Sequence, residues 1–323
     1  MRAIRFHELG GPEVLRYEEV LEPQLDDTQV LIKVAAAGVN YSDLGRRKGS
    51  YAIPQPLPAI LGLEVAGTVV RVGADVTDFV PGQRVMAWVG GGGYAEYAKA
   101  PVEAVYAIPD TLGFVAAAGM PVVFLTAYHI LKTCARVQPQ EFVLVQAGAS
   151  GVGTIAVQLA KLWGARVFAT ASTEEKLQRI RALGVEEVIN YAEKDFVSEV
   201  LRMTDRRGVD IVLECVGGEV LTKSLGCLVP MGRLVIYGRA SGSLPALDSA
   251  QILTRNISVS GLHLGMPPWH AAMHRQAMYE LLEMVQARTL QPVIDRTFPL
   301  AQADAAHRYL AERKTMGKVV LVP

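Results

Sequence analysis

A glycine-rich turn near the middle of the chain constrains the fold more than any other feature of the sequence. It follows the apolar run 142–146 and precedes a segment, 152–163, whose apolar side chains recur at helical spacing. Glycine lets the backbone approach a ligand closely, and a helix start offers unbonded N–H groups and a positive dipole end. We therefore interpret the turn as a site for the pyrophosphate of a dinucleotide. The turn residues are Gly148, Ala149, Ser150, Gly151, Val152 and Gly153.

Strand-like and helical segments alternate after this turn. Further strands are expected at 166–171, 185–189, 209–213 and 233–237. Alternation of this kind predicts βαβ units, and so an α/β fold with a parallel, doubly wound sheet covered by helices on both faces.

The two ends of the chain have a different character. The first 120 residues read as short strands separated by Gly- and Pro-rich turns, and the last 60 as two helices and a strand, 318–322. We predict a discontinuous first domain, made of 1–123 and 263–323, with a dinucleotide-binding domain, 124–262, inserted into it.

The charge and cysteine content exclude several classes of protein. Lys plus Arg and Asp plus Glu each number 32, so the formal net charge is zero and a general affinity for nucleic acid is not expected. The three cysteines form no C-x-x-C pair, which argues against disulfides and a Cys-rich zinc site. No signal peptide and no apolar run of about 18 residues is evident, so we expect a cytoplasmic protein without membrane association.

The end of the second strand bears on the choice of dinucleotide. An Asp or Glu there accepts a hydrogen bond from the ribose 2′-hydroxyl of NAD, but this chain has Ala171, Ser172 and Thr173. Ser172 and Lys176 are suited to a 2′-phosphate, so NADPH is favoured over NADH. The alternative is that Ser172 opens a capping box with Glu175 and that Lys176 is a solvated surface lysine.

Several further motifs resemble one family over nearly the whole chain. They are Ala36 to Asn40 with Asp43, Gly62 to Gly67, Gly92 to Tyr97, Leu125 to Tyr128, Val209 to Gly218, and Gly317 to Val320. With the glycine turn, they resemble the medium-chain dehydrogenases/reductases, in the zinc-independent quinone oxidoreductase (zeta-crystallin-like) branch. The resemblance implies a Rossmann domain inserted in a mostly-β, GroES-like catalytic domain.

The resemblance also implies functional residues. The cofactor contacts would be the glycine turn with Asn40, Thr126, Ser172, Lys176, Tyr191, Val216, Tyr237, Gly238 and Leu262. The substrate pocket would contain Tyr51, Leu63, Tyr128 and Leu264. Tyr51 and Asn40 would be the catalytic residues, Tyr51 as a candidate proton donor whose ring otherwise only packs on the nicotinamide.

Zinc-dependent relatives carry a ligand Cys near Gly38 and a ligand His after Gly62, whereas these neighbourhoods of this chain, Ala37 to Asn40 and Gly62 to Glu64, contain neither. His270 and His274 lie on one helix face but lack the Glu of H-E-x-x-H, so no metal is expected. Without a Lewis acid, the acceptor has to be electrophilic already. We therefore expect hydride transfer from NADPH to a quinone or another conjugated carbonyl.

Two other functions remain open at this point. An NADPH-dependent 2-enoyl thioester reductase would give Tyr51 a larger role and would use Arg46, Arg47 and Lys48 near a carrier phosphate. A crystallin-like protein would bind the cofactor with little catalysis. The resemblance also implies a homodimer, formed by pairing of the strand 257–261 with its twin across a two-fold axis.

Overall fold

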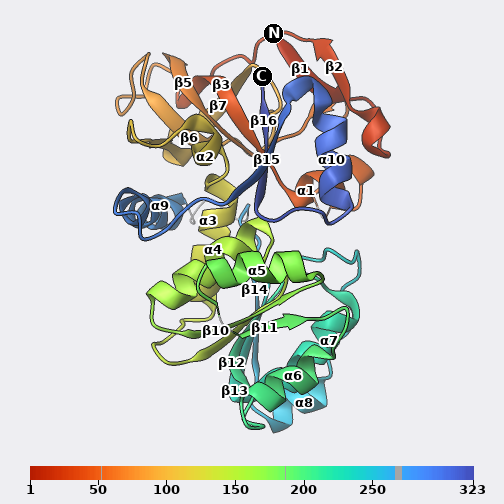
Figure 1. Ribbon diagram of the computed structural model, residues 1–323. Coiled ribbons are helices and arrows are strands. Elements are labelled where there is room, and N and C mark those ends of the chain that lie inside the picture. Colours follow the sequence, from red (N-terminus) through yellow and green to blue (C-terminus); the bar gives the residue numbers. More distant parts are fainter. Residues whose placement is uncertain (52, 186, 266–270) are drawn as a thin grey trace. The chain divides into compact units, whose positions relative to one another are not determined.

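The computed structural model describes residues 1–51, 53–185, 187–265 and 271–323 (Figure 1). They form two compact units, one made of residues 1–125 and 265–323 and the other of residues 126–264. The domain boundaries that we predicted, after residues 123 and 262, each lie two residues before those of the units. Within the described residues, no helix is both long enough and apolar enough to cross a membrane.

The second unit is built on one parallel sheet of six strands. The strands are β9 (Phe142–Val145), β10 (Arg166–Ala171), β11 (Glu187–Asn190), β12 (Val209–Glu214), β13 (Leu228–Ile236) and β14 (Ser258–Gly261). Their order in the sheet, β11-β10-β9-β12-β13-β14, is the order 3-2-1-4-5-6 of dinucleotide-binding Rossmann folds. The predicted α/β class is therefore confirmed.

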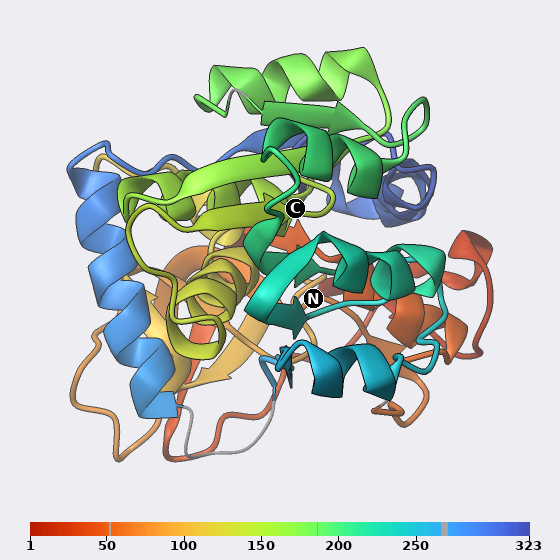
Figure 2. The ribbon, with the colours of Figure 1, turned by 90° about the horizontal axis from the view of Figure 1, so that it is seen from below.

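Helices connect the parallel strands and surround the sheet of this unit (Figures 1 and 2). They are α4 (Gly151–Leu162), α5 (Glu174–Ala182), α6 (Phe196–Met203), α7 (Gly218–Cys227) and α8 (Ser249–Thr254). The central strand β9 is apolar along its length, and Val143, Leu144 and Val145 are fully buried. Such a continuous apolar run is what a strand needs when both faces of its sheet are covered.

The first unit contains two mostly antiparallel sheets. The larger has the order β15-β16-β3-β5-β6-β8, with β7 also paired to β3, and the smaller has the order β2-β1-β4. The larger is made of β3 (Gln29–Val39), β5 (Glu64–Val72), β6 (Arg84–Trp88), β7 (Tyr97–Pro101), β8 (Val105–Ala107), β15 (Ile294–Pro299) and β16 (Lys318–Val322). The smaller is made of β1 (Arg2–Phe6), β2 (Arg16–Glu19) and β4 (Ala59–Ile60). This is the mostly-β unit that the sequence predicted.

Helices of the first unit come from both ends of the chain. They are α1 (Tyr41–Lys48), α2 (Phe114–Ala118), α9 (Ala271–Gln286) and α10 (Ala303–Ala311), while α3 (Pro121–Tyr128) leads into the second unit. A 3-10 turn at Leu300–Gln302 directly precedes α10.

Three strand ends meet in the larger sheet of the first unit. Strand β3 ends at Val39, where its antiparallel neighbours β5 and β16 begin with Glu64 and Lys318. Gly38 pairs with Glu64 on one side and with Val320 on the other. A Cβ at Gly38 would lie 2.5 Å from Glu64 Oε1 and 2.6 Å from the Ala118 carbonyl oxygen. Gly38 therefore makes the room in which the Glu64 carboxylate lies.

We expect Gly38→Ala to destabilise the protein by about 1–3 kcal/mol, because the added methyl group overlaps a backbone oxygen and a buried carboxylate. Gly45→Ala in helix α1 is the matched control. Its Cβ would meet nothing closer than 3.6 Å, and alanine favours a helix interior by about 0.5–1 kcal/mol. Urea unfolding of the two variants measures both effects. Equal stabilities for the two variants would contradict this account of Gly38.

Candidate functional site

The glycine turn lies at the carboxyl end of β9, where the sheet order reverses between β9 and β12. Ser150 caps helix α4, and its hydroxyl accepts a 3.0 Å hydrogen bond from the Gly153 N–H. The backbone N–H groups of Gly151 and Val152 donate no hydrogen bond within the described part of the chain. The helix start thus presents two N–H donors and a positive dipole end to an anion.

The glycines of this turn serve close packing. A Cβ at Gly148 would lie 2.8 Å from the Ala169 Cβ on β10, and one at Gly153 only 2.3 Å from the Ala147 carbonyl oxygen. The left-handed position of the turn falls on Ala147, with a φ of +54°. A non-glycine residue at this φ is strained, and such strain gathers at ligand sites.

Two buried side chains join the ends of β9 and β10. The Thr170 hydroxyl donates to Gln146 Oε1 at 2.7 Å and accepts from the Ala147 N–H at 3.2 Å. The Gly148 N–H in turn donates to the Thr170 carbonyl oxygen at 2.9 Å. Gln146 Nε2 is buried and has no hydrogen-bond partner within the described residues. This network fixes the strained turn and leaves one buried donor for a ligand or water.

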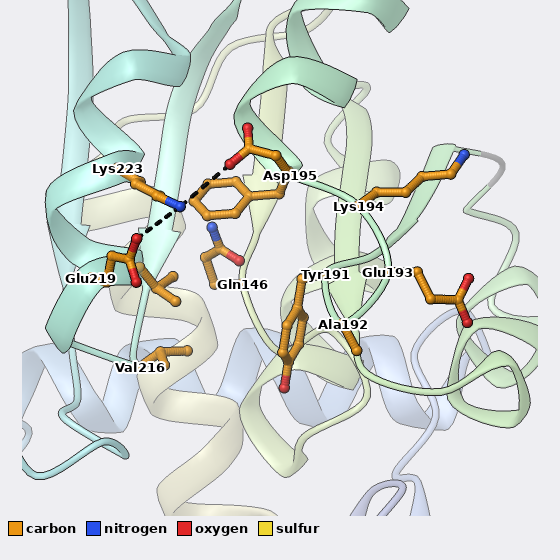
Figure 3. Close-up of a pocket in the computed structure, with 11 residues that line it drawn as sticks. Gln146, Tyr191, Ala192, Glu193, Lys194, Asp195, Val216, Glu219 and Lys223 are labelled. Atoms are coloured by element: carbon orange, nitrogen blue, oxygen red, sulfur yellow. Dashed lines mark hydrogen bonds and ion pairs between the residues drawn. The ribbon is translucent and has the colours of Figure 1, made fainter.

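A pocket of about 380 Å³ lies entirely within the second unit and reaches Gln146, which directly follows β9 (Figure 3). Two segments form most of its wall, one after β11 and one around the start of α7. The residues that line it are Gln146, Tyr191, Ala192, Glu193, Lys194, Asp195, Phe196, Val216, Glu219, Val220 and Lys223. Lys223 joins the two segments, since its ammonium lies 3.4 Å from Asp195 and 2.8 Å from Glu219. The structure thus brings together two predicted cofactor residues, Tyr191 and Val216.

Ser172 does not cap the following helix, so the predicted capping box is wrong. Thr173 is the N-cap of α5 and accepts a hydrogen bond from the Lys176 N–H. The backbone turns one residue later than the S-x-x-E pattern indicated. The Ser172 hydroxyl makes no hydrogen bond within the described residues, at the tip of β10. Tyr191 lies beside this tip, because its N–H donates to the Ala171 carbonyl oxygen at 3.1 Å.

Glu214, at the end of β12, is a site residue that sequence reasoning missed. Its fully buried carboxylate accepts hydrogen bonds from the N–H groups of Val216 at 2.6 Å and Gly217 at 3.0 Å. Burial raises the pKa of Glu214, while the two backbone donors lower it. This carboxylate fixes the loop that carries Val216 into the pocket. The signal for it was an acid at the end of an apolar strand, three residues before the glycine pair Gly217-Gly218.

The predicted residues at the nicotinamide end and their neighbours lie on several elements. Tyr237 and Gly238 follow β13, and a Cβ at Gly238 would lie 2.9 Å from the Cys215 carbonyl oxygen. Leu262 follows β14, and its N–H donates to the Ile236 carbonyl oxygen at 2.9 Å. Leu264 lies two residues further on.

Thr126 and Tyr128 lie in the last turn of α3. The ring of Tyr128 packs edge-on against Trp163, with centroids 5.7 Å apart, beneath the Lys132 ammonium. The structure thus packs Tyr128 into an aromatic cluster of the second unit.

Asn40 in the first unit belongs to a buried cluster of charged and polar groups. Its amide nitrogen donates to Glu64 Oε1 at 2.7 Å, and its amide oxygen accepts from Lys318 Nζ at 2.6 Å. Glu64 and Lys318 form an ion pair at 2.5 Å, with exposed side-chain fractions of 0% and 4%. The Val122 N–H donates to the other Glu64 oxygen at 2.6 Å. Sequence reasoning identified Asn40 but missed Glu64 and Lys318, although both lie in the motifs it used.

A second buried network runs from Asp43, next to Asn40, to helix α10. Tyr94 donates to Asp43 Oδ2 at 2.9 Å and lies 3.2 Å from His307 Nε2, while Arg47 lies 3.1 Å from His307 Nδ1. A guanidinium only donates, so Nδ1 must accept and Nε2 carries the proton. Burial and the charge of Arg47 lower the pKa of His307 to about 3, which keeps the imidazole neutral.

Two predicted pocket residues, Tyr51 and Leu63, lie between Asn40 and Glu64 in the sequence. The Arg46 guanidinium stacks over the Tyr51 ring at 4.7 Å from its centroid, and the Tyr51 N–H donates to the Gly45 carbonyl oxygen. Leu63 is 6% exposed and directly precedes Glu64. Tyr51 thus packs against helix α1, which follows Asn40, and Leu63 directly precedes β5, which begins with Glu64.

Of the two histidines singled out in the sequence, His270 and His274, the structure describes only His274. His270 lies outside the described residues, and His274 is buried edge-on against Trp88, with ring centroids 5.9 Å apart. Within the residues that the structure describes, no group of three His, Cys, Asp or Glu side chains is placed to hold a metal ion.

Comparison with known proteins extends these observations. Residues 26–110 match the family described as alcohol dehydrogenase GroES-like domain, and residues 151–287 the family described as zinc-binding dehydrogenase. A 2-haloacrylate reductase from Burkholderia sp is 37% identical, covering 98% of this chain and 97% of the relative. The Escherichia coli quinone oxidoreductase complexed with NADPH has a TM-score of 0.95 at 30% identity over 100% of both chains. The CurK enoyl reductase has a TM-score of 0.88 at 30% identity, covering 99% and 98%.

The inserted parallel sheet and its glycine turn, together with these matches, define an oxidoreductase of two domains. The chain belongs to the medium-chain dehydrogenase/reductase superfamily, in its quinone oxidoreductase branch. The predicted family and the predicted Rossmann and GroES-like fold are both confirmed.

The acid next to Asn40 gives a pH-dependent prediction. Burial raises the pKa of Asp43 from 3.8 to about 6, against the hydrogen bonds from Asn40 and Tyr94. A raised pKa favours folding while the acid is protonated, so this stabilisation is present below pH 4 and is lost as the pH rises through 6. We expect the unfolding free energy of the wild type to fall relative to Asp43→Asn by about 3 kcal/mol over this window.

Urea unfolding of both proteins at several pH values between 4 and 7 measures this difference. His307, whose pKa also shifts, is present in both proteins, so its own contribution cancels in the comparison. A difference that stays constant with pH would show that Asp43 ionises as freely in the folded chain as in the unfolded one.

Proposed function

We propose that this protein is an NADPH-dependent reductase that transfers a hydride to a quinone or another conjugated carbonyl acceptor. The observation that carries the proposal is the turn after β9, where two free N–H groups, a helix start and a pocket of about 380 Å³ occur together at the sheet's switch point. Ligands of open α/β sheets bind at this point. The NADPH complex of the structurally similar Escherichia coli enzyme supports the choice of ligand.

The second unit would hold the nucleotide part of the cofactor. We assign the pyrophosphate to the turn Gly148, Ala149, Ser150, Gly151, Val152 and Gly153, and the adenosine to the pocket bounded by Tyr191 and Val216. The free hydroxyl of Ser172 and the ammonium of Lys176, with Tyr191, would bind the 2′-phosphate. The absence of a carboxylate at the tip of β10 favours this phosphate over a bare ribose hydroxyl.

The remaining predicted residues are assigned to the reacting end of the cofactor. Asn40, Thr126, Tyr237, Gly238 and Leu262 would contact the nicotinamide. Leu63, Tyr128 and Leu264 would line an apolar substrate pocket with Tyr51, which suits a flat, uncharged acceptor. When bound, the cofactor supplies the hydride from its nicotinamide ring.

The chain's own residues then have three tasks. They orient the acceptor against the cofactor, exclude water, and supply a proton to the reduced oxygen or carbon. We assign the proton to the Tyr51 hydroxyl, whose ring is fixed by the Arg46 guanidinium. Asn40 and Leu63 stand where zinc-dependent relatives have ligands, so we propose that no zinc takes part.

A second candidate function is the reduction of 2-enoyl thioesters. Similarity to the CurK enoyl reductase favours this function. A second support is Arg46, which stacks on the Tyr51 ring and begins the basic run of residues 46–48. This function would require Tyr51 to protonate the α-carbon and Arg46 and Lys48 to bind a carrier phosphate. Arg47, the third basic residue of the run, is buried against His307 and has no part in this role.

We further propose a cytoplasmic homodimer. Strand β14 is an edge of the six-stranded sheet and carries Val259 with 38% of its surface exposed, so it is free to pair with a second copy. A reducing compartment suits its three free cysteines. Sedimentation at micromolar concentration tests the dimer, and a monomer would contradict it.

The substrate class is tested by following NADPH oxidation with para-benzoquinone and crotonyl-CoA in parallel, with NADH as the cofactor control. We expect rapid oxidation with the quinone and NADPH only, unchanged after dialysis against a chelator. A preference for crotonyl-CoA would favour the second candidate. No oxidation with either acceptor would contradict both.

The 2′-phosphate site predicts a change in cofactor selectivity. We expect Ser172→Ala with Lys176→Gln to weaken NADPH binding by about 30- to 1,000-fold, since two contacts are lost and each charged or polar contact contributes roughly 1–2 kcal/mol. NADH binding should stay unchanged. Arg179→Gln on the same helix is the charge-matched control, and fluorescence titration measures all affinities. Equal weakening of NADH would refute this assignment.

Replacing the tyrosine hydroxyl tests the proton donor. Tyr51→Phe should lower kcat by about 10²-fold or more, the usual contribution of a positioned acid, with little change in NADPH affinity. Tyr41→Phe, an exposed tyrosine on α1, is the control. Unchanged turnover of Tyr51→Phe would show that the ring only packs in the pocket.

A further inference from the structure

We infer that the buried ion pair of Glu64 and Lys318 positions the amide of Asn40, fixing which of its atoms faces which way. The inference rests on the proposed function for one point only, that Asn40 acts at the nicotinamide and the acceptor. Glu64 and Lys318 touch Asn40 and each other, so we describe them as positioning residues.

The chemistry of the two partners allows one orientation of the amide. An ammonium only donates hydrogen bonds and a carboxylate only accepts them. The atom of Asn40 at 2.6 Å from Lys318 Nζ must therefore be its oxygen, and the atom at 2.7 Å from Glu64 Oε1 its nitrogen. A rotation of the amide by 180° would place the NH₂ group against the ammonium and the oxygen against the carboxylate.

The ion pair is itself fixed by the backbone. The Val122 N–H donates to Glu64 Oε2, and Gly38 leaves the space in which this carboxylate lies. Lys318 starts β16, directly beside the end of β3 that carries Asn40. Asn40 begins helix α1, and its own N–H donates to Asp43 at 2.9 Å. Both the backbone and the side chain of Asn40 are thus determined, which leaves one of the two amide N–H groups for a ligand.

Stability alone does not account for this arrangement. A buried ion pair costs desolvation of both charges, and apolar residues of similar volume often replace such a pair without loss of stability. An apolar pair at 64 and 318 would bury the same surface but would place no constraint on the amide. Preorganised geometry of a group at a reacting centre is what such a constraint supplies.

The test removes both charges together, so that no single charge is left buried. We expect Glu64→Gln with Lys318→Met to fold, to bind NADPH with a Kd within threefold of the wild type, and to lower kcat with para-benzoquinone by about 10- to 100-fold. Asn40→Ala alone should also lower kcat by about 10- to 100-fold. Added to the Glu64→Gln, Lys318→Met variant, the same substitution should lower kcat by less than threefold, because the changes act through one group. The single variant Lys318→Arg keeps both charges of the ion pair, so its kcat should lie within threefold of the wild-type value.

Independent losses overturn the inference. If Asn40→Ala lowers kcat by the same factor in both backgrounds, the ion pair is structural and does not act through Asn40. An unchanged kcat in the Glu64→Gln, Lys318→Met variant would likewise show that the ion pair does not act through Asn40.

A second measurement does not depend on catalysis. Protein labelled with ¹⁵N at asparagine, with the Asn40 signal identified by its loss in Asn40→Ala, reports hydrogen exchange of the side-chain amide. We expect exchange at least tenfold slower than in a free asparagine side chain. Exchange at the free rate overturns the positioning role. If the wild type oxidises NADPH with neither acceptor, the proposed function fails, and slow exchange still supports the positioning of Asn40.

Discussion

The reversal of strand order between β9 and β12 is the constraint on which the second unit depends. Parallel strands need crossover connections, and those of β9 and β12 leave in opposite directions, so no connection covers the edge between them. Polar groups at this edge find no hydrogen-bond partner in a connecting loop, so other side chains or a ligand have to supply the partner. Glu214 satisfies two backbone N–H groups there, and Thr170 satisfies the strained turn at Ala147. The donors that remain, on Gly151, Val152 and Gln146, all lie at this edge.

The first unit meets a similar requirement with charges. Three strand ends bring a carboxylate, an ammonium and an amide into a space from which water is excluded. Each group there is bonded to another of the cluster, because an unpaired buried charge costs several kcal/mol. Beside it, Asp43, Tyr94, His307 and Arg47 continue the polar interior, with the imidazole kept neutral by burial. The interior of this unit thus concentrates its buried charges around Asn40.

The sequence predicted the architecture well because the periodicities were long and consistent. β10 was predicted to the residue, and the final strand likewise, since each is a β-branched, apolar run that begins shortly after a glycine. The family resemblance extended this to the order of the domains. The cap of α5 was mispredicted because Ser172 and Thr173 are both good caps, and only the backbone decides between them. Glu64 and Lys318 lie 254 positions apart, and no local pattern can show that two such residues meet. The roles of the site residues stay predictions.

The position of Lys318 has a consequence for the order in which the chain can fold. The second unit is one continuous stretch, residues 126–264, whereas the first unit needs β16 to complete its larger sheet. A growing chain leaves the ribosome from its N-terminus, so the Glu64 carboxylate has no ammonium to pair with until Lys318, 254 positions later, has been synthesised. The inserted unit is therefore the one that can fold first during translation, and the first unit completes its larger sheet only after β16 has been synthesised.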